Sequence, residues 1–191
     1  MTQELPRCRL ALQRAREGAT VALVSSGDPG IYGMAGLVLE LAEQEGCSVP
    51  IEIIPGLTAA SAAAARLGAP LMLDFAVISL SDLLVPWETI RHRLEAVAAA
   101  DLVVALYNPR SCKRVRQLEE ARNIFLAHRP ATTPVGVATA VGTPEEKVVV
   151  SDLGHLLGLD VGMRSVVIVG NRSSKRLARY FVTPRGYRLT P

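Results

Sequence analysis

The stretch from Val21 to Ala35 constrains the fold of this chain more than any other. It begins with the apolar run VALV, breaks at the turn-forming residues SSGDPG, and continues as a helix-competent segment to Glu45. A strand that ends in a glycine-rich turn and leads into a helix builds ligand crevices in open α/β sheets, at the carboxyl ends of the strands. Gly27 and Gly30 let the backbone approach a ligand where a Cβ atom would block it. The sequence therefore predicts an α/β fold with a binding site at this turn.

A second turn of the same kind lies at residues 53–59, with the sequence IIPGLTA. It closes the next apolar run and opens an alanine-rich helix. The carboxyl ends of neighbouring parallel strands share one end of a sheet, so we expect the two turns to lie side by side. Asp28 adds a carboxylate acceptor to the first turn, and Pro29 fixes its backbone. The pair of turns is a more specific signal than either turn alone.

The composition excludes several functional classes. Of the 191 residues, 49% are hydrophobic and 20% charged, which is typical of a globular chain that can bury a core. The net charge of +3 is mild and aromatic residues make up only 4%, so neither a basic stripe nor a base-stacking surface for nucleic acid is predicted. Three cysteines without a CxxC pair indicate no disulfide framework and no zinc site. With no signal-peptide core and no apolar run of about 18 residues, we expect a cytoplasmic protein without membrane contact.

The pattern along the chain predicts alternating elements. Helices are expected at residues 6–18, 31–45, 58–67, 86–99, 111–129 and 173–180, and strands at 20–25, 50–54, 75–80, 101–107, 134–139, 147–152 and 165–170. The early alternation indicates a parallel sheet, whereas the last three strands indicate a mixed one. We therefore expect two α/β domains, residues 1–72 and 73–191. The first holds only two strands, which is few for an independent sheet.

These turns resemble those of the tetrapyrrole methylases, the S-adenosylmethionine-dependent enzymes of the corrin and sirohaem pathways. The motifs that carry the family resemblance are GDPGIYGMA at 27–35, IIPGLTAASAAAARLGAPL at 53–71 and VIVGN at 167–171. The chain also resembles a branch of the family that methylates C17 of a corrin precursor. The motifs that carry this second resemblance are DFAVISLSDLLVPWETI (74–90), ALYNPRS (105–111) and ATTPVGVATAVGTPEE (131–146). The resemblance extends over nearly the whole chain.

The resemblance implies both a fold and an activity. The implied fold has two α/β domains of the tetrapyrrole methylase type with the cofactor cleft between them. The implied activity is methylation of precorrin-3B at C17 by S-adenosylmethionine, with ring contraction to precorrin-4, in cobalamin biosynthesis. The cobalt-containing substrate of the anaerobic branch is an alternative, because the two branches share these motifs. Family members are commonly homodimers, so a homodimer is expected.

The sequence departs from the family pattern at its start. Members usually begin with a strand that ends in a GxGPG-type loop, ahead of the helix that corresponds to Pro6–Gly18, and no such loop precedes that helix here. We therefore expect a truncated first domain, and a non-catalytic fragment is the alternative from a different functional class. An RNA methyltransferase or a dinucleotide oxidoreductase is disfavoured, because the chain has neither a basic stripe nor GxGxxG.

The resemblance also implies site residues. Those expected to bind the cofactor are Gly27, Asp28, Ile31, Thr58, Ala59, Tyr107, Asn108, Val141 and Asn171. Those expected to contact the substrate are Ser79, Ser81, Asp82, Arg110 and Ser111. Ordinary turns, with Ser111 as a helix cap, would explain the second set as well. No catalytic acid or base and no metal ligand is assigned.

Positively charged side chains near these loops are candidates to bind the carboxylates of such a substrate, because arginine pairs with a carboxylate through two hydrogen bonds. They are Arg110, Lys113, Arg114 and Arg172. A solvated helix face would explain the same residues equally well.

Overall fold

The computed structural model describes residues 3–188. Contacts divide the chain into two compact units, Met1–Ala59 and Ala60–Pro191. The division lies earlier than the domain boundary expected at residue 72, because nearly all of helix α3 (Ala59–Leu67) belongs to the second unit. Each unit is described by itself.

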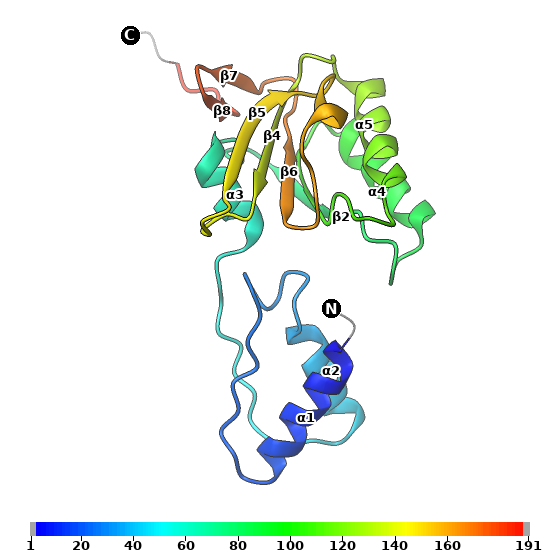
Figure 1. Cartoon of the computed structure of the whole chain (residues 1–191), viewed down its shortest axis with the longest axis vertical. Coiled ribbons are helices and arrows are strands. Elements are labelled where there is room, and N and C mark those ends of the chain that lie inside the picture. Colours follow the sequence, from blue (N-terminus) through cyan, green and yellow to red (C-terminus); the bar gives the residue numbers. More distant parts are fainter. Residues whose placement is uncertain (1–2, 189–191) are drawn as a thin grey trace. The chain divides into compact units, whose positions relative to one another are not determined.

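The second unit is built on a five-stranded mixed sheet with the strand order β2-β3-β6-β4-β5 (Figure 1). Its strands are β2 (Phe75–Ser79), β3 (Val103–Tyr107), β4 (Pro134–Thr139), β5 (Lys147–Asp152) and β6 (Ser165–Val169). Strands β2 and β3 are parallel, whereas β6 is antiparallel to both β3 and β4, and β5 is antiparallel to β4. The carboxyl ends of β2, β3 and β4 therefore lie at one end of the sheet, which we call its carboxyl end. Strand β6 ends at the opposite end.

Helices α4 (Trp87–Ala99) and α5 (Arg116–His128) cover one face of this sheet (Figure 1). Apolar residues three and four positions apart form one stripe on each helix, and that stripe is buried against the strands. Leu94 of α4 and Phe125 of α5 are fully buried, in one cluster with Val104 and Leu106 of β3. The dense core between the helices and the sheet gives its carboxyl end a rigid support.

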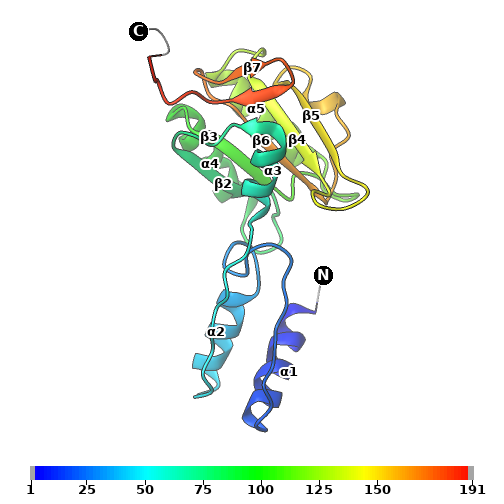
Figure 2. The same ribbon diagram turned by 90° about the vertical axis from the view of Figure 1, so that its left-hand side faces the viewer.

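Helix α3 lies on the other face of the sheet (Figure 2). Its contact with β4 requires a residue without a side chain, because a Cβ atom on Gly136 would lie 2.5 Å from Cδ1 of Leu67. Glycine is rare inside strands and commonly marks such a close approach. The small residues of α3, including the buried Ala60 and Ala63, allow the helix to pack close to its neighbours.

A small second sheet joins β1 (Gly68–Ala69), β8 (Tyr180–Val182) and β7 (Lys175–Leu177) in this unit. The helix predicted at residues 173–180 is therefore wrong. Ala178 has a φ of +53° in the tight turn between β7 and β8, and β8 pairs with β1. Burial of Phe181 fixes this hairpin, and such a tertiary contact overrides local helix preference. A short 3₁₀ turn, Leu156–Gly158, completes the unit.

The first unit holds helices α1 (Glu4–Arg16) and α2 (Ala35–Gln44). They pack through a small cluster of buried side chains that includes Cys8, Leu12, Val38 and Leu41. Helix α1 ends at Arg16, and Gly18 follows its C-cap residue Glu17 as the predicted C′ glycine, where a φ of +91° favours glycine. No helix among residues 3–188 is long and apolar enough to cross a membrane.

Residues 20–25 and 50–54 do not form the strands predicted for them. Both segments run without strand pairing, and apolar side chains on them are open to solvent, with Val24 80% and Ile54 72% exposed. A strand forms only where a neighbouring strand satisfies its backbone N–H and C=O groups, and the first unit supplies no such partner for these segments within residues 3–59. These segments have the apolar pattern of strands, but within residues 3–188 they lack the pairing that strands require.

Several of the remaining predictions agree closely with the structure, whereas the helices predicted at 31–45 and 111–129 begin later than expected, at Ala35 and Arg116. Helix 58–67 and helix 86–99 match α3 and α4 to within a residue, and strands 134–139 and 147–152 match β4 and β5. The mixed character of the five-stranded sheet is confirmed, as is the α/β class.

Candidate functional site

The two glycine-rich turns of the first unit are joined by the carboxylate of Asp28. Its Oδ1 accepts a hydrogen bond from the backbone N–H of Gly30 at 2.8 Å, and its Oδ2 accepts one from the N–H of Gly56 at 3.0 Å. The expectation that the turns lie side by side is therefore confirmed. One carboxylate fixes both the shape of its own turn and the position of the second turn.

These hydrogen bonds also fix the charge of Asp28. The N–H of Gly56 and then that of Gly30 stabilise the carboxylate, and so they hold the pKa of Asp28 below its ordinary value. The group is ionised at neutral pH. The first turn, which the sequence predicts as a binding site, therefore carries the negative charge of Asp28.

Both turns depend on glycine where they approach each other. Gly27 has a φ of +78°, in the left-handed region that favours glycine. A Cβ atom on Gly56 would collide with the carbonyl oxygen of Gly27. Ile31, three residues beyond Asp28, is 40% exposed, which leaves an apolar side chain open beside the turns.

A hollow of about 910 Å³ opens within the first unit, between the extended segments 19–25 and 49–56. The two turns contribute Gly27, Pro29 and Gly56 to its wall. The hydroxyl oxygen of Ser25, also in the wall, is buried and has no hydrogen-bond partner among residues 3–188. A mostly apolar hollow with a few polar groups fits an organic ligand better than a bare ion.

The second unit gathers predicted site residues at the carboxyl end of its sheet. The side-chain amide of Asn108, just beyond β3, donates to Oγ of Ser79, at the end of β2, at 3.0 Å. The backbone N–H of Ala60, at the start of α3, donates to the hydroxyl of Tyr107 at 2.7 Å. Asn108 itself has a φ of +49°, a conformation that asparagine tolerates better than most residues. The ends of β2, β3 and α3 are therefore linked through polar side chains.

The neighbouring loops carry the residues predicted to contact substrate. Ser81 donates its backbone N–H to Oγ of Ser79 at 3.2 Å, and Asp82 accepts from the side chain of Gln117 on α5 at 2.8 Å. For Arg110 the described residues offer no hydrogen bond or ion pair.

The interpretation of Ser111 as the cap of a helix beginning there is wrong. Helix α5 begins at Arg116, after Val115. Ser111 instead closes a separate turn, in which its Oγ accepts from the N–H of Arg114 at 3.0 Å. Serine favours turns for the same reason that it favours helix caps, so the sequence alone does not separate the two roles.

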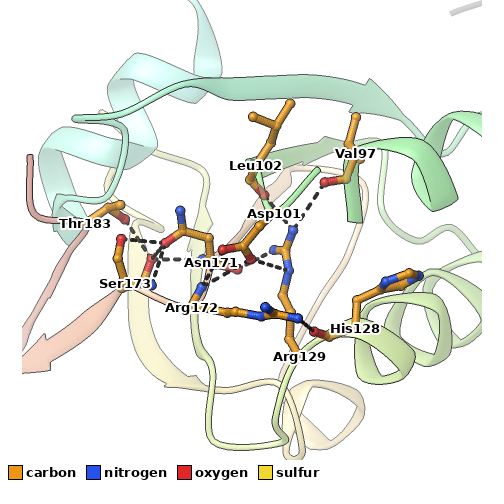
Figure 3. A network of polar contacts seen from close by, with 11 residues as sticks. Val97, Asp101, Leu102, His128, Arg129, Asn171, Arg172, Ser173 and Thr183 are labelled. Carbon is orange, nitrogen blue, oxygen red and sulfur yellow. Dashed lines mark hydrogen bonds and ion pairs between the residues drawn. The ribbon is translucent and has the colours of Figure 1, made fainter. Parts of the chain in front are cut away.

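Two predicted cofactor residues lie at opposite ends of the sheet. Val141 follows β4 and so lies at the carboxyl end, as Tyr107 does. Asn171 follows the antiparallel β6, and its Oδ1 accepts hydrogen bonds from Ser173 and Ser174 within its own turn (Figure 3). The structure therefore does not bring Asn171 together with Tyr107 and Asn108. Strand direction decided this, and the motif VIVGN does not reveal it.

Near Asn171, the buried Arg129 holds several chain segments together (Figure 3). Its guanidinium donates to the carbonyl oxygens of Leu102 at 2.7 Å, Val97 at 3.4 Å and Gly170. Asp101 lies 3.6 Å from its Nε, and this ion pair opposes the burial that lowers the pKa of Arg129. Sequence reasoning missed this residue, because nothing in a charged helix end marks one arginine as buried.

Comparisons with known proteins agree with these features. The model of the family "Tetrapyrrole (Corrin/Porphyrin) Methylases" matches residues 4–157. The chain is 48% identical over 189 residues to a probable cobalt-factor III C(17)-methyltransferase of Salmonella typhimurium, covering 99% of this chain and 78% of the relative. It is 43% identical over 193 residues to a precorrin-3B C(17)-methyltransferase of a Sinorhizobium species, covering 97% and 76%.

A solved structure shows the same fold. The crystal structure of the methyltransferase CobJ superposes with a TM-score of 0.86 at 40% identity, covering 95% of this chain and 77% of that one. Some curated relatives are much longer, and the chain spans 35% of the length of one of them.

Proposed function

Because this chain belongs to the tetrapyrrole (corrin/porphyrin) methylase family, we propose that it transfers a methyl group from S-adenosylmethionine to C17 of precorrin-3B, with ring contraction to precorrin-4. The cobalt-containing counterpart of that substrate is the alternative, since relatives of both kinds match at similar identity. Either reaction belongs to cobalamin biosynthesis. We further propose a homodimer, as the family resemblance implies, and a location in the cytoplasm, as expected from the sequence.

The joined turns at Asp28 and Gly56 carry this proposal. S-adenosylmethionine, when bound, supplies an electrophilic methyl group, so the protein needs no nucleophile of its own. Its work is to hold the reactants in line and to keep water away from them. The site suits that task because it is built mainly from backbone. It also has a fixed carboxylate, an exposed apolar side chain and, at Ser25, a buried hydroxyl without a hydrogen-bond partner among residues 3–188.

We propose cofactor contacts in each of the two units. In the first unit they are Gly27, Asp28, Ile31, Thr58 and Ala59, and in the second they are Tyr107, Asn108 and Val141. We propose no cofactor contact for Asn171, because its side-chain oxygen is already engaged in its own turn. Ser79, Ser81, Asp82, Arg110 and Ser111 remain proposed substrate contacts.

A second candidate function is binding of the cofactor without methyl transfer. The observation that favours it is the absence of strand pairing in segments 20–25 and 50–54, which leaves the first unit with a thin core. Such a chain would bind S-adenosylhomocysteine yet release no methylated product.

Calorimetric titration with S-adenosylhomocysteine tests the cofactor site. We expect saturable binding, and we expect Asp28→Ala to raise Kd by at least about tenfold, because charge-assisted hydrogen bonds that fix both turns are removed. Asp74→Ala is the matched control, since Asp74 is exposed and lies away from the turns in the sequence. Equal affinity in all three proteins, or no binding by a folded sample, would refute the site.

A further inference from the structure

The second unit buries two arginines in different ways. The Nε of Arg129 is buried without a hydrogen-bond partner, but three carbonyl oxygens and the carboxylate of Asp101 surround its guanidinium, so its charge is compensated. Arg114 is 8% exposed, yet its guanidinium has only the carbonyl oxygen of Asn108 at 2.9 Å and the sulfur of Met163 at 3.7 Å. No described carboxylate lies within ion-pair distance of it, and its Nε is buried without a partner. Arg114 is thus a buried cation without a counter-ion.

Such an arrangement is unfavourable in the protein alone. Removing a guanidinium from water costs free energy that only an opposite charge and well-formed hydrogen bonds offset. Arg114 has no carboxylate beside it, and its buried Nε has no hydrogen-bond partner. A bound anion would therefore supply the opposite charge that the fold does not. A planar carboxylate matches the guanidinium best, since it can accept two parallel hydrogen bonds.

The position of Arg114 indicates which ligand would bring that carboxylate. It lies in the turn closed by Ser111, and its side chain bonds to Asn108 at the carboxyl end of the sheet. The loop that follows β2 is joined to the first turn of α5, the helix that begins two residues after Arg114, because Asp82 of that loop accepts a hydrogen bond from Gln117. On this loop Leu83 is 83% and Leu84 96% exposed.

Two adjacent leucines open to water are unusual unless a ligand or partner covers them. An apolar loop beside an uncompensated cation matches a ligand that is flat and apolar at its centre and carries carboxylates on its rim. A tetrapyrrole has this chemistry. S-adenosylmethionine also carries a carboxylate, but it offers no comparable apolar surface for both leucines.

We propose that Arg114 binds a carboxylate side chain of the tetrapyrrole and that Leu83 and Leu84 contact the macrocycle. The proposal rests on the proposed function, and it deepens it by naming a residue that selects the substrate. Asn108 is held by the same guanidinium, so substrate binding would also stabilise the loop that follows β3.

Fluorescence titration with uroporphyrin III, a tetrapyrrole polycarboxylate, and with its methyl ester tests this proposal. We expect Arg114→Gln to weaken uroporphyrin binding by at least about tenfold, and Arg114→Lys to restore part of it, because lysine keeps the charge but not the planar fork. The ester, which lacks the charges, should bind all three proteins equally. Leu84→Ser should weaken both ligands.

Arg116→Gln is the matched control, because Arg116 is exposed and already paired with Glu120. Unchanged uroporphyrin affinity in Arg114→Gln would overturn the proposal. So would a loss of S-adenosylhomocysteine affinity alone, because the carboxylate would then be that of the cofactor. If Arg114→Gln does not fold, the comparison of acid with ester in Arg114→Lys decides the question.

The two proposals fail separately. If the unaltered chain binds no S-adenosylhomocysteine, the proposed function fails, whereas Arg114-dependent binding of uroporphyrin would still be measurable. If cofactor binding is intact and Arg114 has no effect on either ligand, only the inference about Arg114 fails.

Discussion

Replacing Arg129 with methionine is expected to lower the free energy of unfolding by about 3–5 kcal/mol. The side chain is completely buried and ties the carbonyl oxygens of Val97, Leu102 and Gly170 to one group. Methionine fills similar space but donates no hydrogen bond, so three acceptors and the charge of Asp101 lose their partner. Urea unfolding followed by circular dichroism measures the loss.

Arg172→Met is the control for this prediction. Arg172 is exposed and its side chain donates one hydrogen bond, to the carbonyl oxygen of His128 at 3.3 Å (Figure 3). Its replacement is expected to change stability by no more than about 0.5 kcal/mol. The stability loss of Arg129→Lys should fall between those of the other two variants, since the lysine ammonium cannot reach all the acceptors that the guanidinium joins. An Arg129→Met loss as small as that of Arg172→Met would show that the network contributes little.

Replacing Gly56 with alanine is expected to abolish measurable binding of S-adenosylhomocysteine. The added methyl group would collide with the carbonyl oxygen of Gly27, so the two turns must separate. Separation breaks the hydrogen bond between the Gly56 N–H and Asp28, and with it the geometry on which the cofactor site depends. Calorimetry with the unaltered chain as reference measures the effect.

Gly36→Ala is the matched control, because a Cβ atom at Gly36 meets nothing within 4 Å. Gly36 lies in α2, where alanine favours the helix by about 1 kcal/mol, so this variant should be slightly more stable and bind equally well. If Gly56→Ala binds as tightly as Gly36→Ala, the close approach of the turns is not needed for cofactor binding.

Much of the second unit could be predicted from the sequence, because the apolar patterns of most of its helices and strands match surfaces that the structure buries. The apolar runs of β3, β4 and β6 and the apolar stripes of α4 and α5 correspond to buried surfaces, whereas the apolar run of β5 has no buried residue. The predictions failed where a distant partner decides the structure. Segments 20–25 and 50–54 have the pattern of strands without the neighbours, and residues 173–180 form a hairpin because β8 finds β1.

The candidate site was predictable in part for the same reason. The glycine-rich turns follow from local chemistry, and the bond between Asp28 and Gly56 confirms their pairing. The placement of Asn171 depends on the direction of β6, which its residues do not encode. The burial of Arg114 likewise depends on how the turn at Ser111 folds against Met163, and no spacing of charged residues reveals that.

Methyl transfer from isotope-labelled S-adenosylmethionine tests the proposed activity most directly. The chain is incubated with precorrin-3B and, separately, with its cobalt-containing counterpart, and the product is examined by mass spectrometry and by NMR of the labelled carbon. We expect one labelled methyl group at C17 of one of the two macrocycles and a loss of that product in Gly56→Ala. Binding of S-adenosylhomocysteine without any labelled product, or a label at a different carbon, would contradict the proposed activity.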